Sequence, residues 1–241
     1  PIYQTTSYVF ENVDHAAALF NLETFGNIYT RIMNPTQAVL EERVAALEGG
    51  TAALAVASGH AAQALVFHLL LEPGDEFIAA RQLYGGSINQ FTQSFKKFDW
   101  NVRFADTDNA ESFRAALTPK TKAIFVESIA NPGGIITDIA AVSAVAKEAG
   151  VPLIVDNTLA TPYLMRPIEH GADIIVHSLT KFLGGHGNSI GGAIVDCGTF
   201  DWMKSGRYPT LSEPSPSYHG VTYAETFGNF AFAIAARVFS L

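Results

Sequence analysis

Seven short apolar runs, separated by segments with helical periodicity, constrain the fold of this 241-residue chain most strongly. The runs are rich in Val, Ile, Phe and Ala and do not alternate with polar residues, which is typical of strands buried on both faces of a sheet. They are residues 53–57, 76–80, 102–105, 123–127, 152–156, 173–177 and 192–196. Strands alternating with helices predict an α/β fold with three layers and a mostly parallel seven-stranded sheet.

Two of the intervening helices have recognisable ends. Residues 35–48 can be capped by Asn34 and are stopped by Gly49-Gly50, and their apolar face should face the core. That face consists of Leu40, Val44 and Leu47. Residues 139–149 can be capped by Asp138 and end at Gly150.

The stretch 52–71 has no formal charge and could be mistaken for a membrane span. Ser58-Gly59 interrupts it, so a short strand followed by a buried helix is the better interpretation. The chain also lacks the basic start and apolar run of a signal peptide.

The ends of the chain differ from its middle. Residues 1–30 carry no clear element and are interpreted as an arm that contacts another subunit. Residues 31–223 form the predicted main domain, within which 206–222 has the prolines of an extended loop. Residues 224–241 have a helical pattern and are expected to begin a linker helix to a C-terminal domain that this chain lacks.

The composition excludes several classes of protein. Charged residues make up 16% of the chain and the net charge is −8, whereas ordinary domains have about 25% charged residues and nucleic-acid binders are usually basic. The single cysteine, Cys197, excludes a disulfide scaffold and indicates a reducing compartment, the cytoplasm. The low charge predicts that part of the surface meets another subunit or domain.

Polar residues follow five of the predicted strands. Ligands in open α/β sheets bind at the carboxyl ends of strands, so these residues should converge on one crevice. They are Ser58, Gly59, His60, Tyr84, Glu127, Ser128, Asn131, Asp156, Asn157, Thr158, Ser178, Thr180 and Lys181.

Lys181, in the segment HSLTKFLGGHG (177–187), is the central candidate. A lysine between a buried strand and Phe-Leu should be desolvated, which lowers its pKa and gives a nucleophilic amine suited to a Schiff base. The hydroxyls of Ser178 and Thr180 could hold a phosphate beside it. The alternative is a lysine that extends its amine into solvent.

The other candidates also have two interpretations each. Asp156 could meet a protonated pyridine nitrogen or cap the following turn. The amides after Ser58 could bind an anion, or Ser58 could be a plain helix cap. Tyr84 could stack on a ring or belong to the core. Arg31, next to Tyr29, could grip a phosphate or form a surface ion pair.

One competing motif is present. Residues 187–191 (GNSIG) match G-x-S-x-G and make Ser189 a candidate hydrolase nucleophile. That motif requires a strand before the serine and a helix after it, whereas a glycine-rich loop precedes Ser189 and a strand follows. We interpret the match as chance. The chain has no P-loop, H-E-x-x-H or C-x-x-C motif, and no metal site is expected.

Several segments together resemble one family, the Cys/Met metabolism (trans-sulfuration) enzymes that depend on pyridoxal 5'-phosphate (PLP) and have the aspartate-aminotransferase-like fold. The segments are YTRIMNPT (29–36), ALEGG (46–50), ASGHAA (57–62), LYGG (83–86), ESIANPGG (127–134), VDNTLATP (155–162) and HSLTKFLGGHG (177–187). The likeness extends over nearly the whole chain.

The resemblance implies a role for each candidate. Lys181 would bind PLP covalently and move protons, Asp156 would hold the pyridine nitrogen protonated, and Tyr84 would stack on the ring and assist proton transfer. The phosphate would be bound by the Gly59 and His60 amides with Ser178 and Thr180. Ser58 and Thr158 would also belong to the cofactor-binding set. Asn131 would lie near the 3'-oxygen, while Tyr29 and Arg31 would reach the phosphate in a neighbouring subunit. Glu127 receives no role.

The implied activity is γ-replacement on O-acetylhomoserine by sulfide or a thiol, which gives homocysteine or methionine and acetate. Three segments resemble the sulfhydrylases of the family: LYGGSINQF (83–91), with Gly86 where methionine γ-lyases have cysteine, FLGGHGNSIGG (182–192) and PSPSYHG (214–220). Methionine γ-lyase or cystathionine γ-synthase activity is the alternative. The resemblance also implies a homo-oligomer, a dimer at least and commonly a tetramer.

Overall fold

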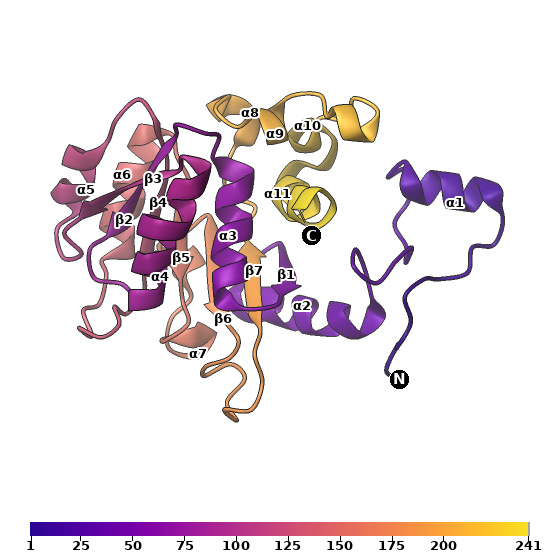
Figure 1. The fold of residues 1–241 in the computed structure, drawn as a ribbon, viewed down its shortest axis with the longest axis horizontal. Helices are drawn as coiled ribbons and strands as arrows, with labels where there is room; N and C mark the ends of the chain where they lie inside the picture. Colours follow the sequence, from indigo (N-terminus) through magenta and orange to yellow (C-terminus); the bar gives the residue numbers. More distant parts are fainter. Residues whose placement is uncertain (241) are drawn as a thin grey trace.

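The computed structural model describes residues 1–240, and a seven-stranded sheet forms its centre (Figure 1). The strands are β1 Ala52–Val56, β2 Glu76–Ala80, β3 Asn101–Ala105, β4 Thr121–Glu127, β5 Leu153–Asp156, β6 Ile174–Ser178 and β7 Gly192–Asp196. All seven predicted strands are confirmed to within two residues at either end.

The strands lie in the order β1-β7-β6-β5-β4-β2-β3. β7 is antiparallel to both β1 and β6, and the other neighbours pair in parallel. Six strands therefore run in one direction, and their carboxyl ends meet at one edge of the sheet. The mostly parallel α/β fold is confirmed.

Helices connect the strands and pack on the sheet, except α1, which lies in the arm away from the sheet (Figure 1). The longer ones are α1 Val13–Phe20, α2 Pro35–Glu48, α3 Gly59–Leu70, α5 Ala110–Ala116 and α6 Ile139–Ala149. The short ones are α4 Gly85–Asn89, α7 Thr161–Leu164, α8 Trp202–Ser205, α9 Pro209–Ser212, α10 Tyr223–Phe227 and α11 Ala231–Ala235. Among the described residues, no helix has the length and apolar character needed to cross a membrane. The uncharged stretch 52–71 is β1 and α3, as predicted.

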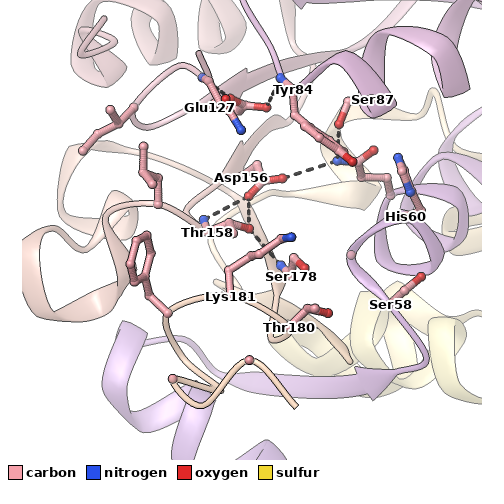
Figure 2. Close-up of a pocket in the computed structure, with 18 residues that line it drawn as sticks. Ser58, His60, Tyr84, Ser87, Glu127, Asp156, Thr158, Ser178, Thr180 and Lys181 are labelled. Carbon is pink, nitrogen blue, oxygen red and sulfur yellow. Dashed lines mark hydrogen bonds between the residues drawn. The ribbon is translucent and has the colours of Figure 1, made fainter. Parts of the chain in front are cut away.

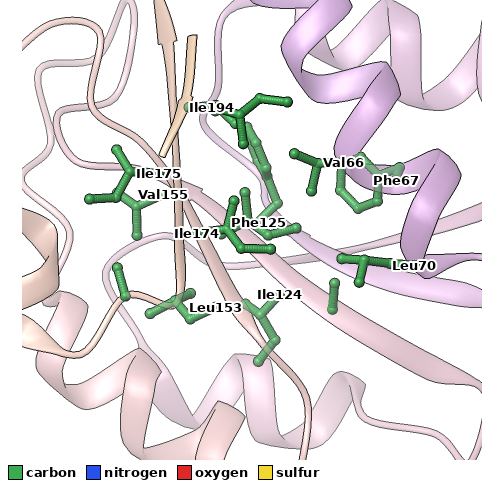
Figure 3. Packing of buried hydrophobic residues seen from close by; sticks show 14 of the residues in the cluster. Val66, Phe67, Leu70, Ile124, Phe125, Leu153, Val155, Ile174, Ile175 and Ile194 are labelled. Carbon is green, nitrogen blue, oxygen red and sulfur yellow. The ribbon is translucent and has the colours of Figure 1, made fainter. Parts of the chain in front are cut away.

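The core lies between α3 and the central strands (Figure 3). Phe67 of α3 packs on Phe77 of β2, with 4.2 Å between ring centroids, and Phe125 of β4 lies beside them. Each of these rings is completely buried. Large apolar side chains on every central strand thus hold the strand ends in a fixed register.

The predicted apolar face of α2 is confirmed for Val44, which is 4% exposed, and wrong for the two leucines. Leu40 and Leu47 are 42% and 54% exposed, whereas Glu41 and Glu48 point inward. Glu41 accepts hydrogen bonds from the Ala55 amide of edge strand β1 and from Arg237, so polar partners decide which face is buried. Two leucines of α2 are left on the surface.

Three further predictions about irregular segments need correction. The arm 1–30 is not free of structure, because the Asn12 side chain caps α1. The loop 206–222 is not extended throughout and contains two short helical segments, α9 and a turn at Pro216–Tyr218. The expected continuous helix 224–241 is interrupted at Gly228, which has φ 52°; Leu241 lies outside the described residues.

Candidate active site

A pocket of about 600 Å³ opens at the carboxyl edge of the sheet. We call it the strand-end pocket (Figure 2). It is lined by Ser58, Gly59, His60, Gln63, Tyr84, Ser87, Glu127, Ile129, Asn131, Asp156, Thr158, Leu159, Ser178, Thr180, Lys181, Phe182, Gly185 and Gly187. The predicted convergence of five strand ends is therefore what the structure has.

One wall is the amino end of α3. Ser58 caps the helix by accepting a hydrogen bond from the Ala61 amide at 3.1 Å, and the first intrahelical bond runs from Ala62 to Ser58. The amides of Gly59 and His60 precede that bond, as at any helix start. A Cβ added at Gly59 would lie 2.8 Å from Ser178 Cβ, so glycine lets the helix end lie against β6. Ser58 can therefore cap α3 while the Gly59 and His60 amides are free of that cap and suited to an anion.

Lys181 enters the pocket from the loop after β6, as Figure 2 shows. The expected desolvation of this lysine is not found, because its side chain is exposed, as is that of Phe182. The sequence argument assumed that the apolar neighbours would cover the amine. Phe182 instead lines the pocket as an exposed side chain, and Leu183 is half-buried outside its lining.

Asp156 lies on the pocket floor at the end of β5. Thr158 donates to its Oδ1 from both its backbone amide (3.0 Å) and its hydroxyl (2.5 Å), and Gln63 Nε2 donates to its Oδ2 at 3.3 Å. Burial raises the pKa of this carboxyl above its ordinary value despite these bonds. Within residues 1–240, Asp156 forms no ion pair. Asp156 thus both caps the turn and presents an uncompensated carboxylate.

Glu127, the last residue of β4, is 5% exposed and lies between two loops of the pocket. Its Oε1 accepts a hydrogen bond from the Tyr84 amide at 2.7 Å, and its Oε2 accepts one from the Asn131 amide at 2.9 Å. Burial, followed by the nearby charge of Asp156, raises the pKa of Glu127 to about 7.

This raised pKa predicts how stability depends on pH. Folding favours protonated Glu127, so its contribution is complete below the usual pKa of 4.5 and is lost as pH rises through about 7. The free energy of unfolding of the cofactor-free protein should fall by about 3 kcal/mol from this group between pH 5 and 8. Denaturant unfolding across that range measures the fall. The same fall in Glu127→Gln would contradict the assignment.

Tyr84 follows β2 and is 48% exposed, which excludes the core interpretation. Its ring lies 5.9 Å from that of His60, centroid to centroid. A Cβ added at Gly86 would lie 2.4 Å from Tyr84 Cε1 and 2.9 Å from His60 Cε1. The absence of a side chain at Gly86 therefore sets where the Tyr84 ring lies.

The two adjacent glycines provide a matched test. We expect Gly86→Ala to displace the Tyr84 ring and to lower turnover by about tenfold, because small misplacements of site groups are costly. Gly85→Ala should have little effect, because a Cβ there meets no atom within 4 Å. A crystal structure and steady-state kinetics of both variants check this. Equal kinetics for the two would count against control of the ring by Gly86.

The structure adds residues to the predicted set and leaves others outside the pocket. Gln63 and Ser87 were missed, although Gln63 follows Gly59 by four residues and so lies on the same face of α3. Ser128 and Asn157 do not line the pocket. Asn157 donates to Glu48 Oε1, which also contacts His177 Nε2 at 2.5 Å, in a fully buried cluster behind the strand ends.

Tyr29 and Arg31 also lie elsewhere. The Arg31 guanidinium carbon is 5.7 Å from the centre of the Tyr29 ring, and Arg31 lines a separate hollow beside Gln37 and Leu40. Their predicted role toward a neighbouring subunit remains a prediction.

Ser189 does not have the geometry of a hydrolase nucleophile. It lies in the exposed loop between β6 and β7, and its hydroxyl donates to Asn188 Oδ1 at 3.2 Å. No helix follows it, because β7 begins at Gly192. The G-x-S-x-G match is therefore not a nucleophile elbow.

Lys181 and the buried carboxylate of Asp156 lie at adjacent strand ends, beside the amino end of α3. Comparison with known families agrees with this arrangement. Residues 1–221 match the model of the family described as Cys/Met metabolism PLP-dependent enzyme. The chain belongs to this family. It is thus a PLP-dependent chain, as predicted.

Relatives within the Cys/Met metabolism family carry consistent names. The chain is 55% identical to O-acetyl-L-homoserine sulfhydrylase of Leptospira meyeri, over 99% of this chain and 55% of that protein. It is 54% identical to O-acetyl-L-homoserine sulfhydrylase 1 of Thermus thermophilus, over 99% and 57%. The chain therefore spans little more than half the length of the curated relatives it matches.

A solved structure of the family has the same fold. It is a putative O-acetylhomoserine (thiol)-lyase of Campylobacter jejuni, with a TM-score of 0.89 and 37% identity over 98% of this chain and 64% of that one. That crystal structure contains N'-pyridoxyl-lysine-5'-monophosphate.

The residues of the strand-end pocket fit PLP by their own chemistry. The cofactor offers a cationic ring nitrogen, a phosphate and an aldehyde. Asp156 is a buried carboxylate without an ionic partner in the described part of the chain, the amino end of α3 supplies amides suited to an anion, and Lys181 supplies an amine.

Proposed function

We propose that the strand-end pocket holds PLP and catalyses γ-replacement on O-acetylhomoserine, with sulfide or a thiol as the second substrate. The observation that carries the proposal is the placement of Lys181 and Asp156 at adjacent strand ends, beside the open amino end of α3. The names of relatives at 54–55% identity support the choice of substrate.

Each residue of the pocket has a task in this proposal. Lys181 Nζ would hold the cofactor and would be the base that moves protons at Cα and Cβ of the substrate. Asp156 would keep a proton on the ring nitrogen, and the Gly59 and His60 amides, with Ser178 and Thr180, would bind the phosphate. Tyr84 covers one face of the ring, and Asn131 lies near its 3'-oxygen.

When bound, PLP withdraws electrons from the amino acid attached to it. The protein then determines where protons go. Acetate departs from Cγ of the substrate, and sulfide or a thiol adds to the same carbon to give homocysteine or a thioether such as methionine. Asp156 is suited to its task because a buried carboxylate gains most from a cationic partner.

The direct test is to supply the protein with PLP, O-acetylhomoserine and sulfide. We expect homocysteine and acetate as products. Release of α-ketobutyrate without homocysteine would indicate a γ-lyase. Preference for O-succinylhomoserine with cysteine would indicate a cystathionine synthase.

We further propose a homo-oligomer, a dimer at least, in which Tyr29 and Arg31 complete the neighbour's site. Val39, Leu40 and Leu47 of α2 are exposed apolar side chains, as are several on the arm, and a second copy could cover them. Figure 1 shows the arm extending away from the sheet. The single cysteine, Cys197, is buried and supports a cytoplasmic location.

Mixing two inactive variants tests the shared site. In a dimer of Arg31→Ala and Lys181→Ala subunits, one site receives both substitutions and the other receives neither. After dissociation and reassociation, we expect the mixture to recover about a quarter of wild-type activity, because half of the dimers are mixed. Each variant treated alone is the control. Activity no greater than that of the controls would mean that Arg31 acts within its own subunit.

A further inference from the structure

Glu127 joins two parts of the strand-end pocket that are distant in sequence. Tyr84 lies 43 residues before it, and Asn131 lies 4 residues after it. Both donate a backbone N–H to the Glu127 carboxylate, one to each oxygen. Figure 2 shows Glu127 and Tyr84 next to each other at the upper wall of the pocket.

We propose that Glu127 is a positioning residue that fixes this wall, with Oε1 holding the Tyr84 segment and Oε2 holding the Asn131 segment. The inference deepens the proposed function, on which it rests, because it assigns Tyr84 and Asn131 their places around the cofactor. Glu127 is not a catalytic acid or base here, since backbone amides occupy both of its oxygens.

A glutamate suits this task better than a glutamine or an aspartate would. A carboxylate is an acceptor at both oxygens, and its bonds to N–H groups are charge-assisted. A glutamine would face one of the two amides with its own N–H₂ group. An aspartate has the charge but is one methylene shorter, so it could reach one amide and not both.

The backbone at Glu127 is itself held by hydrogen bonds. Its own carbonyl accepts a hydrogen bond from the Thr137 hydroxyl at 2.6 Å, and the next amide, Ser128, donates to Asp156 O at 2.9 Å. The side chain therefore extends from the paired, buried end of β4.

The two loops differ in their other anchors. Tyr84 directly precedes the five-residue helix α4, makes no side-chain cap there and is half exposed. The Asn131 segment has two backbone bonds of its own, from the Ala130 amide to Ile135 O and from the Gly134 amide to Ala130 O. Residues 131–134 are all exposed. Loss of the carboxylate should therefore loosen both segments while the sheet stays folded.

The state of the carboxylate depends on the charges that surround it. The titratable groups that share the pocket are Asp156, Lys181, His60 and Tyr84. Of these, Asp156 acts with burial to bring the pKa of Glu127 to about 7. Above that pKa Glu127 is ionised and both of its oxygens are acceptors, so its role is tested there.

Hydrogen exchange of the protein without cofactor tests the proposal directly. We expect Glu127→Gln to reduce the protection of amides in segments 83–86 and 129–133 by at least tenfold. Glu127→Asp should free one segment and leave the other protected. All variants and the wild type are compared at about pH 8, where Glu127 of the wild type is ionised.

Asp196→Asn is the matched control. Asp196 is a buried carboxylate that also accepts two backbone amides, from Gly198 and Ala233, and burial raises its pKa to about 6. It ends β7, at the opposite edge of the sheet from the pocket. Its substitution should loosen the α11 segment and leave 83–86 and 129–133 unchanged.

Several outcomes would overturn the proposal. One is that Glu127→Gln keeps the wild-type amide protection in segments 83–86 and 129–133. Another is that Asp196→Asn loses as much protection in these segments as Glu127→Gln. If Glu127→Gln does not fold, Glu127→Asp decides. Because these measurements use neither cofactor nor substrate, the proposed reaction can fail while the positioning role stands, and the reverse is also true.

Discussion

Lys181→Ala should abolish the covalent attachment of PLP. Wild-type protein loaded with the cofactor should show the absorption band of a lysine-bound cofactor at about 420 nm, and the variant should lack it. Turnover of O-acetylhomoserine should fall on the order of 10³-fold or more, because one side chain supplies both the attachment and the proton transfers. Absorption spectra and steady-state kinetics measure the two effects.

The matched control for this variant is Lys97→Ala. Lys97 is an exposed lysine in the turn after α4, outside the strand-end pocket. It should keep both the band and the activity. If Lys181→Ala retains the band and borohydride still links the cofactor to the protein, another amine carries the cofactor, and the assignment of Lys181 is wrong.

Asp156→Asn should lower cofactor affinity and turnover without lowering the stability of the fold. The substitution removes the buried negative charge while nearly keeping the shape of the side chain, so the affinity for PLP should fall at least tenfold and turnover about 10²–10³-fold. The cofactor-free variant should be at least as stable as the wild type, because burial raises the pKa of Asp156 and the ionised group costs free energy at neutral pH. Cofactor titration, kinetics and denaturant unfolding test these expectations.

Asp173→Asn provides the comparison for this effect. Asp173 is also buried, and it accepts hydrogen bonds from the Leu153 amide and the Thr199 hydroxyl, next to the start of β6. Its substitution should leave cofactor affinity unchanged. Equal loss of affinity in both variants would show that Asp156 acts through general stability and not through a charge next to the cofactor.

The sheet and most of the pocket could be predicted because they depend on local patterns. Continuous apolar runs specify strands buried on both faces, and the residue after each run lies at the carboxyl edge whatever the strand order is. That rule correctly predicts that Ser58, Tyr84, Asp156 and Lys181 lie together. The role of Glu127 stayed open because the amides of Tyr84 and Asn131 meet its carboxylate only in the folded chain.

Errors arose where the partner of a residue is distant in sequence. The apolar pattern of α2 favoured Leu40 and Leu47 as core residues, but Arg237 and the edge of β1 draw Glu41 inward, while His177 and Asn157 draw Glu48. Lys181 was expected to be covered by its sequence neighbours, yet Phe182 is 64% exposed. In α2, tertiary contacts and not the local apolar pattern decide which residues face inward.

The antiparallel direction of β7 has a consequence for the lysine loop. Since Ser178 pairs with Gly192, the loop 179–191 leaves the sheet and returns to it at neighbouring positions. The segments after β2, β4 and β5 lead into helices, and the next strand begins at the opposite edge of the sheet. The loop that carries Lys181 can instead lengthen or shorten around residues 186–189 while both of its ends stay fixed, which makes the mouth of the pocket the part of this fold most open to redesign.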